Sequence, residues 1–203
     1  MVVDLHRTGG VGQPALPRRA RAGVAGVFCI TGVVFATWAA RIPAIEQRLR
    51  LDDARLAVAF MALNAGAVAG LQLGGVLVPR AGGRTAMRLA VPTYAMTLLG
   101  PALAPSLPAL CAGLFAMAFA NSVVDVAMNA HGIAVERRYG RPILSSLHAM
   151  LTLGGMAGGA LGTLAAHLGV GVSVHFLAVA VLTGGAGLVA VRGLLPASAD
   201  ADG

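Results

Sequence analysis

The sequence predicts an all-α polytopic membrane protein with six transmembrane helices. Of its 203 residues, 57% are hydrophobic and only 11% are charged, whereas a soluble domain carries roughly 25% charged residues. The hydrophobic residues gather in six continuous runs, and arginines occupy the short gaps between them. So few charges cannot cover a water-facing surface, which excludes an ordinary soluble enzyme, a disordered regulator and a fibrous repeat.

Each apolar run has the length of one membrane-spanning helix. A helix rises about 1.5 Å per residue, so roughly 20 residues cross the ~30 Å hydrocarbon layer. The runs are continuous rather than alternating, which disfavours strands. The expected spans are about 22–40, 56–78, 85–104, 108–135, 143–166 and 171–191.

The residues outside these spans predict two tails. Residues 1–21 are polar and contain four arginines, which predicts a flexible cytoplasmic tail. Residues 193–203 are expected to form a second cytoplasmic tail, and residues 22–192 the six-helix bundle. The first apolar run is too long for a cleaved signal peptide, and five further runs follow it, so we expect it to remain in the membrane.

The distribution of basic residues predicts the orientation. All 15 basic residues are arginines, and the net charge is +7. With six spans, 11 arginines fall on the side of the two termini and 4 on the other side. Basic loops stay cytoplasmic, which predicts a multi-pass protein of the plasma (inner) membrane with both termini inside. Arginines in short gaps are typical of membrane topology rather than of a nucleic-acid interface, so we expect no nucleic-acid partner.

The motifs of common enzymes are missing from the sequence. There is no GxxxxGK[ST], HExxH or CxxC, and the Gly-x-Ser-Gly turn of an intramembrane serine protease is also missing. Cys29 and Cys111 lie in separate apolar runs without metal-ligand spacing. We therefore expect no enzymatic activity, no metal and no cofactor.

Two stripes of glycine are the second architectural signal. Within each stripe the glycines recur every four residues, so they share one helix face and let another backbone approach closely. They either pack helices inside the bundle or face a partner domain. The stripes are Gly66, Gly70 and Gly74 in one span and Gly154, Gly158 and Gly162 in another.

Asp125 is the one acidic residue expected inside a span. The other seven acids lie in loops or tails, and a carboxylate at mid-membrane costs about 2.5–3.5 kcal/mol. Asn121, Asp125 and Asn129 are spaced i, i+4, i+8 and form a polar stripe on one helix face. Asp125 is either a protonatable group in a substrate pathway, or a neutral acid that hydrogen-bonds Asn129 and holds helices together.

His148 is expected at a similar depth in the membrane to Asn129. Asn129 lies six residues before the end of its span and His148 five after the start of the next, so both lie roughly 8–9 Å from the same membrane face. His148 either serves the substrate pathway or satisfies a helix carbonyl. Further cavity candidates are Asn64 and Trp38, although Trp38 also suits an interfacial belt. Weaker candidates are Arg41, Gln72 and Tyr94, and His131 and His175 are expected to be structural.

Two stretches of the sequence carry a resemblance to a known family. They are FATWAARIPAIEQRLRLDDARLAVAF (35–60) and DVAMNAHGIAVERRYGRPILSSLHAMLTLGGMAGG (125–159). With the six-helix pattern they resemble the N-terminal half of a major facilitator superfamily transporter, closest to the fucose-permease-like branch. The resemblance implies one half of a twelve-helix fold, built from two inverted three-helix repeats at about 22–104 and 108–191.

The loop between the second and third spans resembles the gating signature of the superfamily, G-x-L-x-D-R-x-G-R-R. The acidic position of the signature holds Pro79, and one of its arginine positions holds Gly83. The resemblance gives Arg80, Gly82 and Arg84 a role in gating. It also makes Asp125 the proposed proton carrier and places His148 where sugar permeases have a cavity-lining Gln. The positions that match are Gly75, Leu77, Arg80 and Gly82.

These observations together predict a secondary active transporter of a small organic solute, coupled to protons. The expected partners are the solute, protons, the lipid bilayer, and a second six-helix half or another copy, because alternating access needs two bundles. We expect the chain to be a half-length or truncated transporter. A non-transport membrane scaffold or partner half is the alternative, and drug efflux is a further transporter reading.

Overall fold

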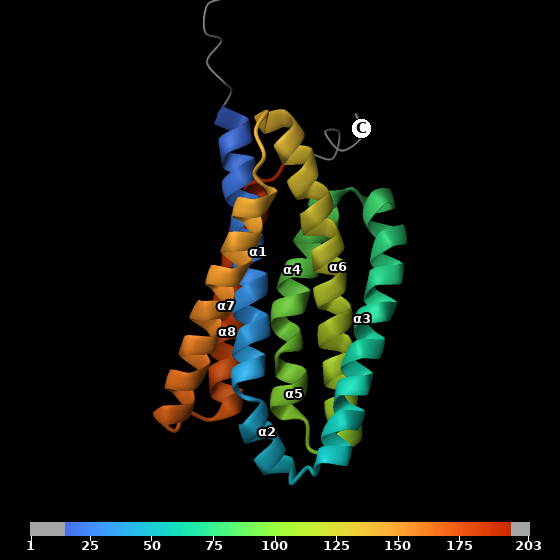
Figure 1. The fold of residues 1–203 in the computed structure, drawn as a ribbon, viewed down its shortest axis with the longest axis vertical. Helices are drawn as coiled ribbons and strands as arrows, with labels where there is room; N and C mark the ends of the chain where they lie inside the picture. Colours follow the sequence, from blue (N-terminus) through green and yellow to red (C-terminus); the bar gives the residue numbers. More distant parts are fainter. Residues whose placement is uncertain (1–14, 196–203) are drawn as a thin grey trace, which may run out of the picture.

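The computed structural model describes residues 15–195, and these residues form helices without any strand (Figure 1). Five of the helices are long and apolar enough to cross a membrane, by length and composition. They are α1 (Ala15–Ala40), α3 (Asp53–Ala81), α6 (Leu107–Tyr139), α7 (Leu144–His167) and α8 (Val172–Ala190). The shorter elements are α2 (Ile42–Leu49), α4 (Gly83–Thr97), α5 (Leu99–Leu103) and the 3₁₀ turn η1 (Val191–Gly193). The prediction of an all-helical membrane protein is confirmed.

The third expected span, 85–104, is not one helix in the structure. It is divided at Leu98 into α4 and α5, so neither part reaches the length of a span by itself. Pro101 explains the division, because its ring lacks an N–H and clashes with the carbonyl of Thr97 one turn earlier. Six spans therefore remain a prediction, with five supported by helix length.

Both ends of the described chain depart from the expected tails. α1 begins at Ala15, inside the range expected to be a flexible tail. Near the other end, Leu194 and Leu195 are buried, and the backbone N–H of Leu195 donates to Nε2 of His131 at 3.1 Å. The apolar side chains at these two positions pack against the bundle. The rest of both expected tails, 1–14 and 196–203, lies outside the described residues.

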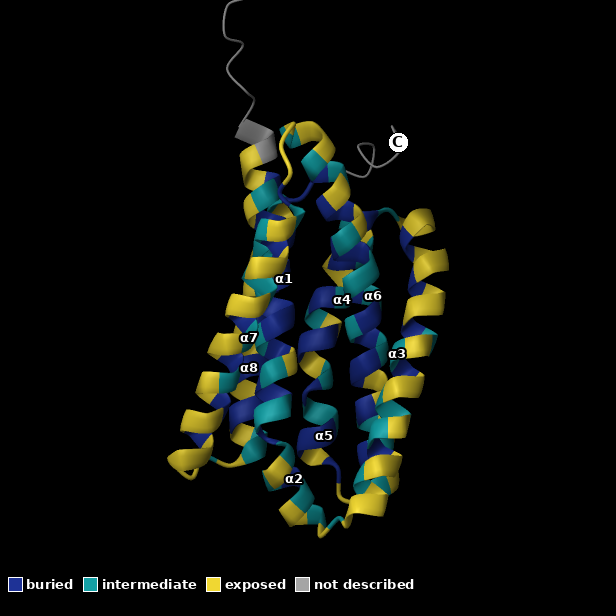
Figure 2. Ribbon diagram, in the orientation of Figure 1, coloured by how far each residue is buried: buried dark blue, intermediate teal, exposed yellow. Residues whose placement is uncertain are grey.

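The helices form a continuous series of contacts across the bundle. The central four are α1, α8, α4 and α6, with α7 packed on α1 and α3 packed on α6 (Figure 1). The central helices supply the largest fully buried side chains, among them Phe28, Met87, Tyr94 and Phe176. The outer helices α3 and α7 show exposed residues along most of their length (Figure 2).

The glycine stripes lie at the two tightest helix contacts. A Cβ on Gly66 or Gly70 would collide with the backbone carbonyls of Phe115 and Phe119 on α6. Those residues therefore have to be glycine for α3 and α6 to lie this close. The stripe on α7 contacts α1 in the same way: Gly154 meets the carbonyl of Cys29, and Gly158 that of Val33. The stripes pack helices inside the bundle, and the alternative that they face a partner domain is wrong.

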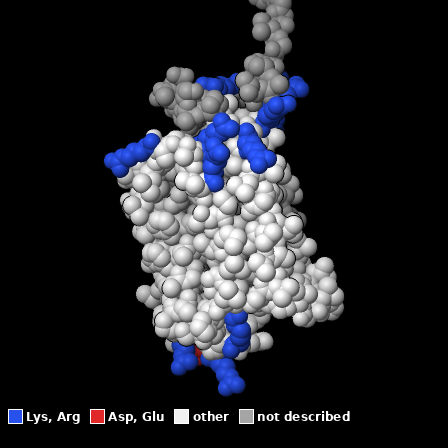
Figure 3. Space-filling model, turned by 180° about the vertical axis from the view of Figure 1, so that it is seen from behind, with Lys and Arg blue, Asp and Glu red and all other residues white. Residues whose placement is uncertain are grey.

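Charged side chains lie at the two ends of the molecule, with an uncharged band between them on the face seen in Figure 3. The start of α1, the α3–α4 turn and the end of α6 lie at one end, together with both ends of the described chain (Figure 1). α2 lies at the other end, where Arg48 donates hydrogen bonds to the carbonyls that end α5. This separation of charge suits a bilayer-spanning bundle.

Candidate functional site

The polar stripe lies near the middle of α6, the longest helix of the bundle. Asn129 Nδ2 donates to the backbone carbonyl of Asp125 at 2.9 Å and to its Oδ1 at 3.0 Å. Both residues are half-buried, and the Asp125 carboxylate has no other hydrogen-bond partner among residues 15–195. The expected Asp125–Asn129 bond is present, but it joins two residues of one helix. It therefore does not hold two helices together.

His148 lies on the first turns of α7, on the same side of the bundle as Asp125. Its ring is exposed and meets the buried ring of Phe28 on α1 edge-on, with 5.2 Å between the centroids. His148 and Asp125 are close enough for their charges to interact. His148 of α7 thus contacts an aromatic ring of α1, and its charge reaches Asp125 on α6. An acid and an imidazole in such a place can exchange protons with water or a solute.

Asn121 takes part in a second polar feature, one helical turn before Asp125. It lines a cavity of about 100 Å³ between α1, α3, α4 and α6, together with Tyr94 and Phe35. The Oδ1 of Asn121 and the hydroxyl of Tyr94 are both buried without a hydrogen-bond partner in the part of the chain that the structure describes. Tyr94 was only a weaker candidate from the sequence. In the structure it lies at the same cavity as Asn121 and has a buried polar atom of the same kind.

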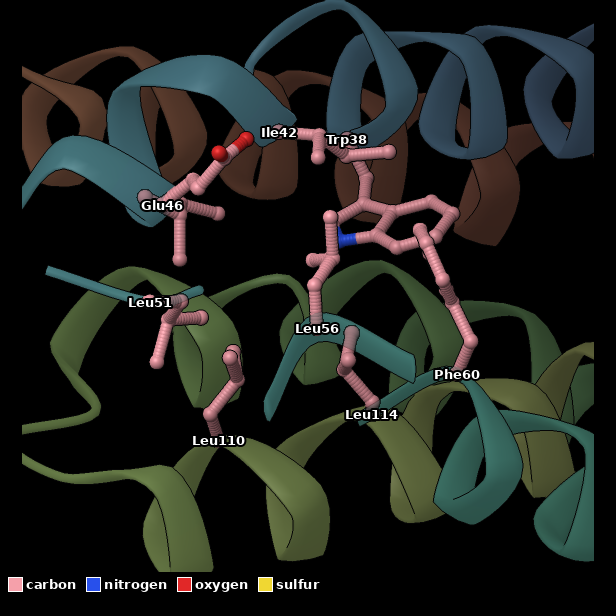
Figure 4. A pocket seen from close by; sticks show the side chains of 9 residues that line it. Trp38, Ile42, Glu46, Leu51, Leu56, Phe60, Leu110 and Leu114 are labelled. Carbon is pink, nitrogen blue, oxygen red and sulfur yellow. The ribbon is translucent and has the colours of Figure 1, made fainter. Parts of the chain in front are cut away.

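The structure does not bring Asn64 and Trp38 to this site. Asn64 is exposed on α3 and donates to the carbonyl of Phe60 on its own helix at 2.9 Å. Trp38 is buried at the α2 end of the bundle, 5.6 Å from Phe35 and 6.3 Å from Phe60 between ring centroids. Its pocket is lined mainly by leucine and isoleucine and has a volume of about 10 Å³, too small for a solute (Figure 4). Trp38 is a packing residue there.

The gating loop is reduced to a single residue. Gly82 alone separates α3 from α4, and its φ of 77° is a conformation that favours glycine. Arg84 Nη2 donates to the carbonyl of Arg192 at 3.3 Å and so connects the start of α4 to η1, the turn that follows α8. Arg80 is exposed and borders an apolar groove of about 540 Å³ between α3, α4 and α6. All three residues lie at or beside the α3–α4 turn, at one end of the bundle, and their role in gating stays a prediction.

Sequence reasoning missed two contributors to this arrangement. Phe28 gave no signal, because it is one aromatic residue within a continuous apolar run. Glu136 was counted only as a loop acid, yet its carboxylate accepts from the backbone N–H groups of Ile143 and Leu144 at 2.7 and 2.9 Å. These two bonds satisfy backbone N–H groups at the start of α7, the helix that carries His148. Within residues 15–195, no group of three or more His, Cys, Asp or Glu side chains could hold a metal ion.

Comparison with known proteins points to membrane transporters. No protein-family model matches the chain. An uncharacterized transporter, y4wD, of Sinorhizobium fredii is 35% identical over 80% of this chain and 43% of its own length. An uncharacterized MFS-type transporter of Yersinia pestis is 29% identical over 72% of this chain and 38% of its own. The membrane protein MosC of Rhizobium meliloti is 29% identical over 66% and 33%.

The chain spans less than half the length of these curated relatives. One of these relatives is named an MFS-type transporter and another a transporter, and the described residues of this chain form five helices that are long and apolar enough to cross a membrane.

Proposed function

We propose that the chain is one six-helix half of a secondary active transporter that moves a small organic solute with proton coupling. The observation that carries this proposal is the Asp125 carboxylate in the middle of α6. It is half-buried, and its one hydrogen-bond partner, Asn129, lies on the same helix. An acid retained at mid-membrane without a helix-joining bond is expected to serve transport rather than packing.

Asp125 is the proposed proton carrier, and Asn129 holds its carboxylate in one rotamer by the 3.0 Å bond. His148 lies near enough to sense the charge of Asp125 from α7. A solute that binds beside Asp125 therefore meets a carboxylate whose charge is lost when it takes up a proton. Asn121 extends the lining of the pathway by one turn. This coupling between proton and solute is the essential property of a symporter or antiporter.

A second bundle is the proposed partner of the described one. The outer faces of α3 and α7 carry exposed apolar side chains that nothing in residues 15–195 covers, such as Val68 and Met156, which are 59% and 68% exposed. Either lipid or another bundle suits such faces. Because the matched region covers less than half of each relative, we propose that a second six-helix half or another copy covers part of them.

The proposed location is the inner membrane with both described ends on the cytoplasmic side. The end of the molecule that carries both described ends has the larger share of the arginines in the sequence. Basic residues favour the cytoplasmic face.

Uptake into membrane vesicles tests the proposal. Vesicles from cells that express the gene would be given a pH gradient and a panel of radiolabelled sugars, polyols and amino acids. We expect gradient-dependent accumulation of at least one compound. Asp125→Asn should abolish that accumulation while the protein still inserts, because an amide cannot carry a proton. Asp53→Asn is the matched control, since Asp53 is an exposed acid in the first turn of α3.

Unchanged pH-dependent uptake by the Asp125→Asn variant would contradict proton coupling through this residue. Insertion with no uptake of any compound would instead favour the membrane scaffold. Export of large aromatic cations, without transport of the sugars, polyols or amino acids, would favour drug efflux.

A further inference from the structure

A small basic pocket lies where the start of α1 meets the end of α6, at the end of the molecule that carries both described ends (Figure 1). It has a volume of about 290 Å³ and is lined by four residues of α1 together with Tyr139, the last residue of α6. The four residues share one face of α1 because of their helical spacing. They are Arg18, Arg21, Ala22 and Ala25, so the pocket has arginines at its outer side and small apolar residues toward the middle of the bundle.

Both arginines are accessible from the pocket and have donors left for a ligand. Arg18 is exposed, and within residues 15–195 no group accepts a hydrogen bond from its guanidinium. Arg21 is half-buried, and its Nη1 donates to the Tyr139 hydroxyl at 3.2 Å, which uses one of its five N–H groups. Its guanidinium carbon lies 5.2 Å from the centre of the Tyr139 ring. No acidic residue lines the pocket, so the two positive charges are not compensated there.

The two arginines lie at the depth of lipid headgroups. α1 has 26 residues and is about 39 Å long, whereas the hydrocarbon layer of a bilayer is ~30 Å thick. With Ala40 at one edge of this layer, the other edge falls about 20 residues earlier, near Arg21. Arg18 then lies among the headgroups, and Ala22 and Ala25 lie where the acyl chains begin.

We propose that this pocket binds the phosphate group of an anionic phospholipid. Arg18 and Arg21 donate charge-assisted hydrogen bonds to the phosphate oxygens. The Tyr139 hydroxyl accepts from Arg21 and still has its own proton to donate to the same group. The acyl chains follow Ala22 and Ala25 into the hydrocarbon layer. Basic pockets between transmembrane helices bind lipid headgroups of this kind.

The shape and charge of the pocket favour a lipid over free phosphate, and an anionic lipid over a zwitterionic one. At about 290 Å³ the pocket is at the lower limit of sites that enclose a small molecule, ~300–1,000 Å³, so it takes a headgroup and leaves the acyl chains outside. Its apolar side offers free phosphate no contact. A choline headgroup would bring a cation against two arginines, whereas the glycerol headgroup of phosphatidylglycerol carries no positive charge. The proposal concerns this pocket alone and does not depend on the transport proposal.

Native mass spectrometry of the purified protein tests the site. The protein in detergent would be titrated with phosphatidylglycerol, phosphatidylcholine or inorganic phosphate, and the bound fraction measured at each concentration. We expect phosphatidylglycerol to bind at least about ten-fold more tightly than phosphatidylcholine, because two arginines attract its net charge. Inorganic phosphate should not bind in the same concentration range. Equal binding of the two lipids, or binding of phosphate as tight as that of phosphatidylglycerol, would overturn the proposal.

Three arginine variants locate the lipid. Arg18→Ala and Arg21→Ala should each weaken phosphatidylglycerol binding at least about ten-fold, because each removes hydrogen bonds to a charged group. Arg19→Ala is the matched control, since Arg19 is exposed at the next position of α1 but does not line the pocket. It should weaken binding by no more than about five-fold, the effect of diffuse attraction to a charged surface. An equal loss in all three variants would show that the overall charge of this end attracts the lipid without a site.

Arg18→Ala keeps the test independent of folding. Arg18 is exposed and has no hydrogen-bond partner among residues 15–195, so this variant should elute from size-exclusion chromatography as the wild type does. Unchanged lipid binding by such a folded variant would overturn the proposal. Arg21→Lys keeps the charge but loses the planar fork that binds two phosphate oxygens, so its binding should lie between those of the wild type and Arg21→Ala.

Discussion

Two pairs of helices in this bundle are packed in the same way but differ in chemistry. α3 packs on α6, and α7 packs on α1, each through three glycines spaced four residues apart. In both pairs the first two glycines meet backbone carbonyls of the partner helix. The third meets a side chain instead: Gly74 meets Val126 at 3.3 Å, and Gly162 meets Ala40 at 2.6 Å, both measured from an added Cβ.

The difference between the pairs lies on the face beside the contact. When Cys29 and Val33 of α1 are matched to Phe115 and Phe119 of α6, the position of Asp125 corresponds to Ala39. The position of Asn121 corresponds in the same way to Phe35. α1 is therefore apolar where α6 is polar. Close packing of two helices needs small residues only at the positions of contact. The adjacent face of each helix can therefore be polar, as on α6, or apolar, as on α1.

The largest expected effect comes from breaking either glycine contact. Gly158→Ala places a methyl group against the backbone of Val33, and Gly70→Ala places one against Phe119. Backbone atoms cannot move aside as a flexible side chain can, so each variant should lose about 1–3 kcal/mol of stability or more. Thermal unfolding in detergent, followed by size-exclusion chromatography, would measure the loss.

The chain offers a matched control for this prediction. Gly159 is next to Gly158, and an added Cβ there meets nothing within 4 Å. Gly159→Ala should be neutral or stabilising by up to ~1 kcal/mol, because alanine has the higher helix propensity. Equal losses at Gly158 and Gly159 would show that the stripe is not a contact.

The glycine contacts show how much of the fold the sequence could predict. Spacing alone indicated two packing faces, because the period of a helix is fixed. It could not say which helices the faces meet, since that depends on contacts between residues far apart in the chain. The interruption at Leu98 had a visible cause in Pro101, but an apolar composition outweighed it in the prediction.

A smaller effect should come from removing the acid that distinguishes α6. Asp125→Leu should raise stability by about 2 kcal/mol, slightly less than the ~2.5–3.5 kcal/mol cost of a mid-membrane acid because Asn129 offsets part of it. Val68→Asp is the matched reverse change, since it introduces an acid at the exposed middle of α3. It should lower stability or insertion by a similar amount.

The outcome for Asp125 also separates function from packing. A destabilised Asp125→Leu variant would mean that the acid holds the bundle together, contrary to the bond confined to α6. Fluorescence-detected chromatography of membrane extracts would compare both variants with the wild type.

Contacts of the candidate site within one helix could be predicted from the sequence, whereas contacts between helices could not. The Asp125–Asn129 bond followed from helical spacing, because both residues lie on one helix. The edge-on contact of His148 with Phe28 and the shared cavity of Asn121 with Tyr94 join different helices. Contacts of that kind depend on how the helices are arranged, and spacing within one helix does not encode them.

The contact between α2 and the end of α5 should matter less than the packing of the spans. Arg48 donates to the carbonyls of Pro101 at 2.9 Å and Ala104 at 3.2 Å, so Arg48→Met leaves the end of α5 without these donors. Because Arg48 is exposed, we expect a loss of about 1 kcal/mol. Arg55→Met at the same end is the control, since Arg55 pairs only with the exposed Asp52 at 3.8 Å. An equal loss in both variants would contradict a specific contact.

The smallest expected effect is at the opposite end, where α1 meets the end of α6. Arg21 Nη1 donates to the Tyr139 hydroxyl at 3.2 Å, and its guanidinium carbon lies 5.2 Å from the centre of the tyrosine ring. Tyr139→Phe keeps the ring and should cost a few tenths of a kcal/mol, whereas Tyr139→Leu should cost about 0.5–1 kcal/mol. Thermal unfolding of the two variants and of Arg21→Met in detergent would rank them. If residues up to Arg21 formed a flexible tail, as their composition predicts, all three variants would unfold at the same temperature as the wild type. A graded loss would instead show that α1 continues past the membrane to meet α6.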